Sequence, residues 1–527
     1  MVPNAMTHTR HAASGMSSRW LLVTLTAALT VVSAVYLLRP IMDPDFFWHL
    51  KTGQWIFDHR RLPASDPFSY TGEAVTTTTM HFTLTAYWAS QLLYSCTYAV
   101  GGWTGIVLLR FVLAAALFAV MWKRRKGDAV VDAALLLVFA VAFLEKTAIE
   151  RPQILSFLGF GLLLHLLDDL KKAPSSTLSP LSVRRSPIPI ALLMLVWANV
   201  HGGFALGQAV IIVCLAAEGA KFAHRSLRPV TGEAYRALLL AGGVGLAASL
   251  LNPNTYRAFG LALSTGPAPG SHGLMKIAEY LSIPEALTLY HDSLRVVDLV
   301  LMLVVAAAIV SRPKEFDITE ALLAAGTGFF AFRHARYMPV FMIVALPLAG
   351  HFLARGAWVR WARVPAVLCA VTLAFIFARD ERHGLARLRT GEWVNPVQFP
   401  VKAADFIVSR NLRGNMYNSY TWGGYLIWRL GPERRVFLDG RNINPDIFWE
   451  GTMIIDPVFS VSGKQRWKPL FEKYAIAYAV MPLEVRGKPN PLVGTLVRDP
   501  GWASVFIGDN SVIFTRRTPG LRETVNR

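Results

Sequence analysis

Apolar segments separated by short polar stretches dominate the chain up to residue 379 and restrict the folds open to it. Inside a bilayer, backbone N–H and C=O groups have no water to bind, so a spanning segment has to be a helix or part of a closed barrel. A mean hydropathy of +0.39 with 17% charged residues is typical of an integral membrane protein. The sequence therefore predicts a polytopic all-α membrane domain of about eleven transmembrane helices. The segments are 20–38, 103–122, 129–144, 154–167, 188–200, 204–222, 235–251, 296–310, 318–332, 338–353 and 364–379.

Lys and Arg residues are distributed unevenly between the loops. With a cytoplasmic N-terminus, the inner segments carry 19 Lys and Arg, and the outer loops carry 11 although they are longer in total. Cytoplasmic loops collect positive charge, so this bias predicts a cytoplasmic N-terminus and an extracytoplasmic C-terminal region. The same bias accounts for the net charge of +19, and nucleic acid is not a predicted partner.

The composition divides the chain into two predicted domains. Residues 1–379 form the membrane domain, and its extracytoplasmic loop 39–102 carries two amphipathic helices, near 46–57 and 82–100, that are expected at the membrane interface. Residues 380–527 are more charged and form a small extracytoplasmic α/β domain. In that domain a helix is expected at 401–412, and strands are expected at Met416, 436–438, 477–481, 504–507 and 512–515.

An acidic pair opens the first outer loop. Asp43 and Asp45 stand two residues apart, and His49 follows them. Such a group can share acid–base work, or its two carboxylates can bind Mg²⁺ or Mn²⁺, although no cofactor is required by the pattern. A plainer interpretation is that Asp43 caps the helix that follows, because Asp and Pro are common at helix starts. We predict catalytic roles for Asp43, Asp45 and His49, with the two acids as ligands if a metal is present.

Basic residues gather at the same predicted membrane face. Arg333, His334 and Arg336 form a compact cationic group at a helix end, and Arg151 offers a planar fork for phosphate. They are predicted to bind a donor phosphate; binding of lipid headgroups is the alternative. Arg151 is also placed to pair with the adjacent Glu150. Arg110 lies within the second segment, where we expect no transmembrane carboxylate as its partner; a polar cavity is the predicted surrounding.

Several short motifs, in this order, resemble those of the GT-C glycosyltransferases, above all a broad set of bacterial GT-C-like membrane proteins. The resemblance covers most of the chain. Protein O-mannosyltransferases and oligosaccharyltransferase catalytic subunits belong to the same superfamily and are more distantly similar. The resemblance implies the plasma membrane of a bacterium as the location. The motifs are Asp43-Pro-Asp45-x-x-Trp-His49, Arg151-Pro-Gln153, Trp197-Ala-Asn199-x-His201, Asn252-Pro, Arg333-His334-x-Arg336 and Trp422-Gly-Gly-Tyr425.

The resemblance implies that a carboxylate of the first loop activates an acceptor hydroxyl or binds a metal, and that basic residues hold the donor phosphate. Many members carry a second acid in this loop, which is missing near residues 81–90 here. His201 is alternatively a structural hydrogen-bonding residue, and the aromatic residues of the last domain are alternatively core. The predicted substrate-binding set is Glu150, Gln153, Asn199, His201, Glu279, Trp422, Tyr425, Asp439 and Arg441.

The location of the acidic pair favours one donor class. Nucleotide sugars are cytoplasmic, whereas the pair is predicted to face outward, so a sugar carried on a membrane polyprenyl phosphate fits better. We predict an inverting, lipid-linked-sugar-dependent glycosyltransferase whose partners are this donor, membrane lipids and an extracytoplasmic acceptor glycan, lipid or protein. The alternatives are a non-catalytic protein of cell-surface glycan assembly and a transporter or flippase of a lipid-linked sugar. Apolar inner halves of the segments argue against transport.

Overall fold

The computed structural model of the chain divides into two compact units that interleave in sequence. Unit 1 comprises residues 1–39 and 107–390, and unit 2 comprises residues 40–106 and 391–527. The first outer loop therefore folds in the same unit as the C-terminal region, while the predicted boundary at residue 380 stays a prediction. The structure describes residues 5–72, 78–147, 149–172, 186–224, 229–264, 281–290, 294–355, 359–380, 392–455, 467–485, 487–508 and 510–517.

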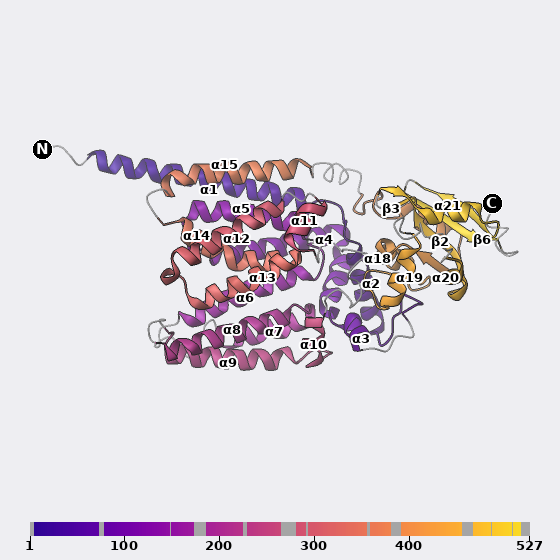
Figure 1. The fold of residues 1–527 in the computed structure, drawn as a ribbon, viewed down its shortest axis with the longest axis horizontal. Coiled ribbons are helices and arrows are strands. Elements are labelled where there is room, and N and C mark those ends of the chain that lie inside the picture. Colours follow the sequence, from indigo (N-terminus) through magenta and orange to yellow (C-terminus); the bar gives the residue numbers. More distant parts are fainter. Residues whose placement is uncertain are drawn as a thin grey trace. The chain divides into compact units, whose positions relative to one another are not determined.

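Unit 1 is built from helices, and one lies at each of the eleven predicted apolar segments (Figure 1). Three of them, α1, α5 and α15, pack together, and α7 packs on both α8 and α9. The bounds are α1 (Ala5–Leu37), α4 (Trp88–Lys123, shared with unit 2), α5 (Ala129–Lys146), α6 (Gln153–Lys171), α7 (Ile188–Val200), α8 (Phe204–Ala223), α9 (Gly232–Ser249), α10 (Arg257–Ser264), α11 (Ile283–Tyr290), α12 (Leu294–Ser311), η5 (Pro313–Glu315), α13 (Ile318–Arg333), η6 (Ala335–Tyr337), α14 (Met338–Leu353) and α15 (Val359–Asp380).

Five stretches of the described helices are long and apolar enough to cross a membrane. They support a multi-pass membrane protein, while the predicted number of about eleven crossings stays a prediction. The short helix α7 is also apolar but has only 13 residues. The five stretches are Ser18–Leu37, Met80–Lys123, Gln153–Lys171, Phe204–Ala223 and Ala335–Leu353.

Local sequence signals explain where several helices begin and break. Asp128 caps α5, and Asp317 caps α13 by accepting the Thr319 N–H at 2.7 Å. These side chains satisfy N–H groups that have no partner within the helix. Within α4, Gly102 adopts φ 54° and ψ −145°, so the helical path is interrupted between the helix expected near 82–100 and the segment expected at 103–122.

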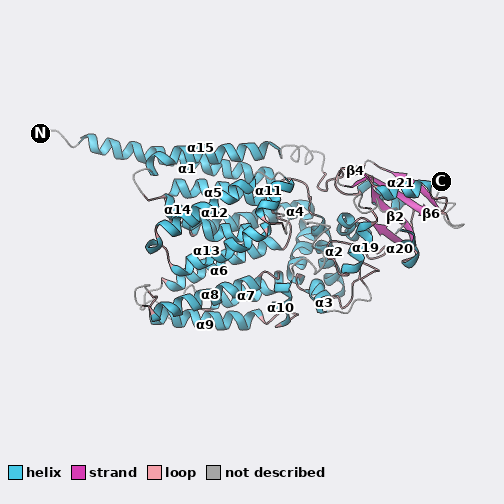
Figure 2. Ribbon diagram, in the orientation of Figure 1, coloured by secondary structure: helices cyan, strands magenta, loops and turns pink. Residues whose placement is uncertain are grey.

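Unit 2 contains all the strands among the described residues (Figure 2). Its four-stranded sheet has the order β1-β2-β6-β5, in which β1 and β2 are parallel and the other pairs are antiparallel. Helix α18 packs on α2, which comes from the first loop. The bounds are α2 (Pro44–His59), α3 (Thr78–Thr85), α17 (Val401–Ser409), β1 (Asn415–Asn418), η7 (Tyr420–Trp422), α18 (Gly423–Leu430), α19 (Pro445–Met453), α20 (Trp467–Lys473), β2 (Ile476–Pro482), β3 (Glu484–Val485), β4 (Lys488–Pro489), α21 (Pro491–Arg498), β5 (Trp502–Ile507) and β6 (Ser511–Arg516).

The strand predicted at residues 436–438 is wrong. Instead of joining the sheet, this segment is held by the buried side chain of Asn418. The Asn418 amide donates to the Leu438 carbonyl at 2.8 Å and accepts the Phe437 N–H at 2.8 Å. A single isolated bridge pairs Val436 with Ser69. The segment is apolar because it is buried, and its backbone groups are satisfied without a ladder.

The first-loop helix expected to lie in the membrane interface is α2, and its apolar side is covered by protein. Phe46 and Phe47 are fully buried, and the Phe47 ring lies 5.0 Å from Phe399 and 5.3 Å from Tyr425. Only Phe57, near the end of the helix, is strongly exposed among its large apolar residues. Packing inside unit 2 therefore accounts for the amphipathic pattern.

Candidate active site

The acidic pair occupies the first turn of α2. Asp43 is the N-cap residue, with φ −83° and ψ 120°, and its Oδ1 accepts the Asp45 N–H at 2.8 Å. Pro44 follows at the first helical position, where its fixed φ suits the helix and its missing N–H costs nothing. The capping interpretation of Asp43 is therefore realised in the structure. It leaves Asp45 as the acid whose position depends on other parts of the fold.

The carboxylate of Asp45 is half-exposed and anchored. The indole Nε1–H of Trp48, one turn further along α2, donates to Asp45 Oδ1 at 3.1 Å. The positive end of the helix dipole also favours a negative charge in the first turn. Sequence reasoning included Trp48 in the acidic motif but gave it no role, although its spacing of three residues from Asp45 places both on one helix face.

Two glycines of the C-terminal region lie against this turn. A Cβ atom added to Gly440 would lie 1.8 Å from Asp45 Oδ1, and one added to Gly424 would lie 2.1 Å from the Pro44 carbonyl oxygen. Neither distance is compatible with a side chain. The glycines of the Trp-Gly-Gly-Tyr and Asp-Gly-Arg sequences therefore let the backbone close onto the acidic turn of α2.

Next to Gly440, three side chains form a buried ion group that we call the arginine triad: Asp66, Asp439 and Arg441. Arg441 Nη1 and Nη2 lie 2.7 and 3.0 Å from the two Asp66 oxygens, and Nε lies 2.7 Å from Asp439 Oδ1. The side chains are 0–4% exposed.

Burial raises the pKa of Asp66 despite the attraction of Arg441, and Asp439 raises it further. Sequence reasoning missed Asp66, which no local signal links to Arg441.

The remaining predicted site residues of unit 2 belong to its core. His49 is 4% exposed, with Nδ1 3.3 Å from the Gln91 amide nitrogen, and its ring lies against Trp48 and Tyr87. Trp422 donates its Nε1–H to the Gln398 carbonyl at 2.9 Å. Burial raises the pKa of Tyr425, whose ring stacks on Phe399. The substrate contacts predicted for these residues stay predictions.

In unit 1, Glu150 is the partner of a buried arginine. Its Oε2 lies 3.1 Å from Arg110 Nη2, and both side chains are 2–3% exposed. Arg110 also donates to the carbonyls of Leu37 and Arg39 at 3.2 and 2.9 Å. Glu150 comes from the loop before α6, so the carboxylate that pairs with Arg110 lies outside the predicted apolar segments.

His201 lies in the turn between α7 and α8 with its ring orientation fixed. Its Nδ1 accepts the Gly203 N–H at 2.9 Å and lies 2.7 Å from the Ser156 hydroxyl, which also accepts the Trp197 Nε1–H at 2.7 Å. Because Nδ1 accepts a backbone N–H, the ring proton of the neutral form is on Nε2. Burial, with help from the Arg336 cation, lowers the pKa of His201 to about 3. His201 is therefore a neutral donor at ordinary pH.

The structure brings His201 and Arg336 into electrostatic contact, as their common predicted face implied. Arg336 and His334 both lie near the ring of Tyr337, in and before η6. Arg333 ends α13 and is exposed. Gln153 begins α6, three residues before Ser156, and Arg151 lies two residues before Gln153; both side chains are half-buried. This part of unit 1 gathers donors suited to an anion.

Two further predicted residues have different outcomes. Asn199 ties the end of α7 to the segment after α9, since its amide donates to the carbonyls of Leu195 at 2.9 Å and Leu251 at 2.8 Å. It therefore has a structural partner on each side. Glu279 lies outside the described residues, and its predicted role stays a prediction.

At the opposite end of α6 lies a second buried ion group, the lysine cluster: Lys171, Lys221, Glu218 and Asp317. Lys171 Nζ lies 2.6 Å from Glu218 and 3.1 Å from Asp317, and Lys221 Nζ lies 2.9 and 2.7 Å from the same two acids. With 19 residues in α6, this cluster lies about 28 Å along the helix from the Arg151 end. Glu218 and Lys221 lie within the predicted segment 204–222, so the expectation of an apolar inner half is wrong for α8. Lys171 and Asp317 lie just outside the segments predicted for α6 and α13.

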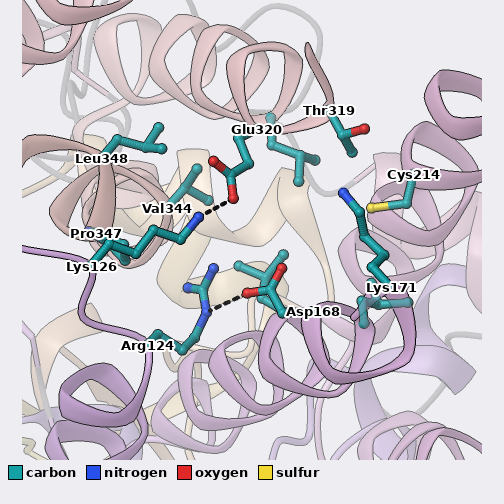
Figure 3. Close-up of a pocket in the computed structure, with 13 residues that line it drawn as sticks. Arg124, Lys126, Asp168, Lys171, Cys214, Thr319, Glu320, Val344, Pro347 and Leu348 are labelled. Carbon is teal, nitrogen blue, oxygen red and sulfur yellow. Dashed lines mark hydrogen bonds and ion pairs between the residues drawn. The ribbon is translucent and has the colours of Figure 1, made fainter. Parts of the chain in front are cut away.

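A cavity of about 30 Å³ lies beside the lysine cluster (Figure 3). That volume holds about two water molecules. In Figure 3, Arg124 points toward Asp168, 3.6 Å away, and Lys126 pairs with Glu320. Lys171 lies beside them on the wall of the cavity. Positive and negative groups thus alternate around a space too small for a sugar.

Within the described ranges, no group of three or more His, Cys, Asp or Glu side chains could hold a metal ion. Asp43 Oδ1 is already the helix cap. Binding of Mg²⁺ or Mn²⁺ by the acidic pair stays a prediction, because Mg²⁺ can be held by one or two carboxylates together with water and substrate phosphate. The chemistry considered below uses no metal.

No family model matches the sequence, and no curated protein sequence matches it. Solved structures do match. Oligosaccharyltransferase AglB from Archaeoglobus fulgidus, in complex with an inhibitory peptide and a dolichol-phosphate, has a TM-score of 0.60 at 12% identity and covers 88% of this chain and 69% of that chain. The same enzyme with Zn and sulfate has a TM-score of 0.55 at 11% identity, over 88% of this chain and 68% of that chain.

ArnT from Cupriavidus metallidurans, in the apo state, has a TM-score of 0.51 at 15% identity and covers 95% of this chain and 98% of that chain. Both proteins are GT-C glycosyltransferases. Identities this low show the fold alone. The predicted GT-C resemblance is confirmed at the level of the fold, while the roles of individual residues stay predictions.

Proposed function

We propose that this chain is an inverting membrane glycosyltransferase that moves a sugar from a polyprenyl-phosphate donor to an extracytoplasmic acceptor. The observation that carries the proposal is the anchored, half-exposed carboxylate of Asp45 in a chain with the GT-C fold. Asp43 is occupied as a cap and His49 is buried, so Asp45 is the acid that can reach a substrate. The AglB structure contains a dolichol-phosphate, which supports this donor class.

In the proposed reaction, Asp45 accepts the proton of an acceptor hydroxyl. The hydroxyl oxygen forms a bond to the anomeric carbon of the sugar, and the bond from that carbon to the phosphate oxygen breaks. The polyprenyl phosphate leaves with the bonding electrons and gains negative charge. One displacement of this kind inverts the anomeric centre. A positioned base contributes about 10²–10⁴-fold to the rate of such a step.

Hydrogen-bond donors and cations of unit 1 are proposed to stabilise the negative charge of the leaving phosphate. Arg336 carries a permanent positive charge beside His201, whose neutral ring offers its Nε2–H. Arg151 and Arg333 add further charge on the same predicted membrane face. Fixed cations and dipoles stabilise charge that develops during bond breaking without having to reorganise.

The test uses donor hydrolysis, because water replaces the unidentified acceptor. The full-length protein in lipid nanodiscs is incubated with polyprenyl phosphates that carry a panel of tritium-labelled monosaccharides, and release of labelled sugar is measured. Asp45→Asn should lower the release rate about 10²–10⁴-fold. Asp58→Asn, an exposed acid on the same helix, is the matched control and should stay within about twofold.

Binding of undecaprenyl phosphate without a sugar is measured in parallel by thermal shift. Arg336→Ala should weaken binding, and Asp45→Asn should not. Full hydrolysis by Asp45→Asn would remove the enzyme proposal. Donor binding without hydrolysis by any variant, the wild type included, would instead favour a non-catalytic protein of glycan assembly.

A further inference from the structure

We propose that the turn Asp439–Gly440–Arg441 is a positioning element that holds the carboxylate of Asp45 in its working orientation. Gly440 is the point of contact, and the arginine triad is the rigid support behind it. This inference rests on the proposed function, because it assigns a role to the surroundings of the proposed base. It replaces the predicted sugar contacts of Asp439 and Arg441 with a contact inside the protein.

The first step is why residue 440 is a glycine. The Cβ of any other residue would lie 1.8 Å from Asp45 Oδ1, 3.0 Å from its carboxyl carbon and 3.5 Å from Oδ2. Its φ is not in the left-handed region, where only Gly102, Gly414 and Gly487 are found among the described glycines. Backbone strain therefore does not require glycine here. The close approach of the Asp45 carboxylate does.

The second step is that the backbone of the turn is held in place by hydrogen bonds. Arg441 follows Gly440 directly, and its guanidinium is held by four hydrogen bonds to the carboxylates of Asp66 and Asp439. Asp439 Oδ1 also accepts the Arg441 N–H at 2.9 Å, which closes the turn. Buried charged hydrogen bonds of this bidentate kind are short and geometrically specific. Movement of the turn would leave a buried charge without its partner.

The third step is that one member of the triad, Asp66, comes from the same loop as the base. Asp66 and Asp45 both belong to the first loop, and Arg441 belongs to the C-terminal region. Gly424 adds a second close contact, since its Cβ would lie 2.1 Å from the Pro44 carbonyl oxygen. The first turn of α2 is thus fixed from the C-terminal side at two neighbouring residues.

This arrangement predicts a specific defect in Gly440→Ala. The added methyl group displaces the Asp45 carboxylate and disturbs its 3.1 Å hydrogen bond from Trp48. A misplacement of about 1 Å in a catalytic group can cost about 10²-fold in rate. We expect kcat for donor hydrolysis to fall about 10–100-fold, while the donor KM changes less than about twofold because the phosphate contacts are elsewhere.

The matched control is Gly494→Ala. Gly494 lies in α21 of the same unit, and nothing lies within 4 Å of the position its Cβ would take. It makes the same chemical change and suits a helix, so kcat and folding yield should stay at the wild-type level.

A second readout does not depend on activity. The indole ¹⁵N–¹H resonance of Trp48, assigned through Trp48→Phe, reports its hydrogen bond to Asp45. Gly440→Ala should shift this resonance, as Asp45→Ala should, and Gly494→Ala should leave it in place. If the wild type hydrolyses no donor, the proposed function fails, and the resonance alone decides whether the turn positions Asp45.

The proposal is overturned if Gly440→Ala keeps the wild-type kcat or leaves the Trp48 resonance unmoved. If Gly440→Ala does not fold, the double variant with Asp45→Ala should restore the yield, because the group that the new Cβ meets has been removed. Failure of that rescue would also overturn the proposal, since the damage would then come from another neighbour.

Discussion

The two units each bury a charged group, but they balance the charge differently. The arginine triad of unit 2 sets two carboxylates, Asp66 and Asp439, against one guanidinium. The lysine cluster of unit 1 sets two ammonium groups against two carboxylates, and the Thr319 hydroxyl donates to Glu218 at 3.0 Å as well. Buried charges are stable only when paired in this way.

The difference between the arginine triad and the lysine cluster shows which buried charges support the proposed site. The triad lies next to Gly440, which touches the proposed base. The lysine cluster joins α6, α8 and α13 at the end of the helices away from His201, and the cavity beside it holds only about two water molecules. Charges within membrane helices often mark a transport path. Here their balance and the small cavity indicate a structural role for the lysine cluster.

The largest effect that tests this contrast should come from Arg441→Ala. Removing the guanidinium leaves two buried carboxylates without a partner, which typically costs about 3–5 kcal/mol. We expect a strong loss of folded protein, measured as yield and unfolding temperature in detergent. Arg429→Ala is the control, because Arg429 pairs with Asp405 on the surface of the same unit at 42–54% exposure, where pairs contribute about 0–1 kcal/mol. Equal loss in both variants would contradict a supporting role for the triad.

A smaller effect is expected from the lysine cluster. In Lys221→Met, Glu218 and Asp317 still keep Lys171, so the cost should be about 1–3 kcal/mol. The folded fraction should hydrolyse donor at the wild-type rate, because the cluster is not part of the proposed site. A double-mutant cycle with Glu218→Gln should give a coupling of about 0.5–3 kcal/mol. A large loss of kcat in the folded fraction would instead assign the cluster to catalysis.

The helices were predictable from the sequence because their apolar segments are long and bounded by polar ends. A helix lies at each predicted segment, and the break at Gly102 follows from two consecutive glycines. The strand at 436–438 was not predictable. Its apolar residues are those of a buried strand, and only the side chain of Asn418, distant in sequence, shows how the backbone is satisfied instead.

The candidate site was predictable only where it depends on residues that are close in sequence. Local geometry gives the cap of Asp43 and the place of Asp45, because both depend on residues within one turn. The partners of Arg441 and Arg110 come from other loops, so no spacing in one sequence links them to Asp66 or Glu150. Glycines carry no side-chain chemistry, and the role of Gly440 appears only when its neighbour is known.

The smallest expected effect is the pH dependence of folding stability. Its sign should be opposite for the two ion groups, so it separates them most directly. Burial raises the pKa of Asp66 above its usual value of 3.8. The folded protein therefore holds this proton more tightly than the unfolded chain, and the stabilisation is present below pH 3.8 and is lost as the pH rises. For Asp317, burial opposes ionisation, but Lys171 and Lys221 hold the pKa well below 3.8. Its stabilisation is present above that pH and is lost as the pH falls.

Unfolding temperatures of the wild type, Asp66→Asn and Asp317→Asn, measured from acidic to neutral pH, test this opposition. The unfolding temperature of the wild type, relative to that of Asp66→Asn, should fall as the pH rises above 3.8. The difference between wild type and Asp317→Asn should stay constant there and shrink only at lower pH. If both differences moved in the same direction over the same range, the opposite pH dependence expected for the arginine triad and the lysine cluster would be contradicted.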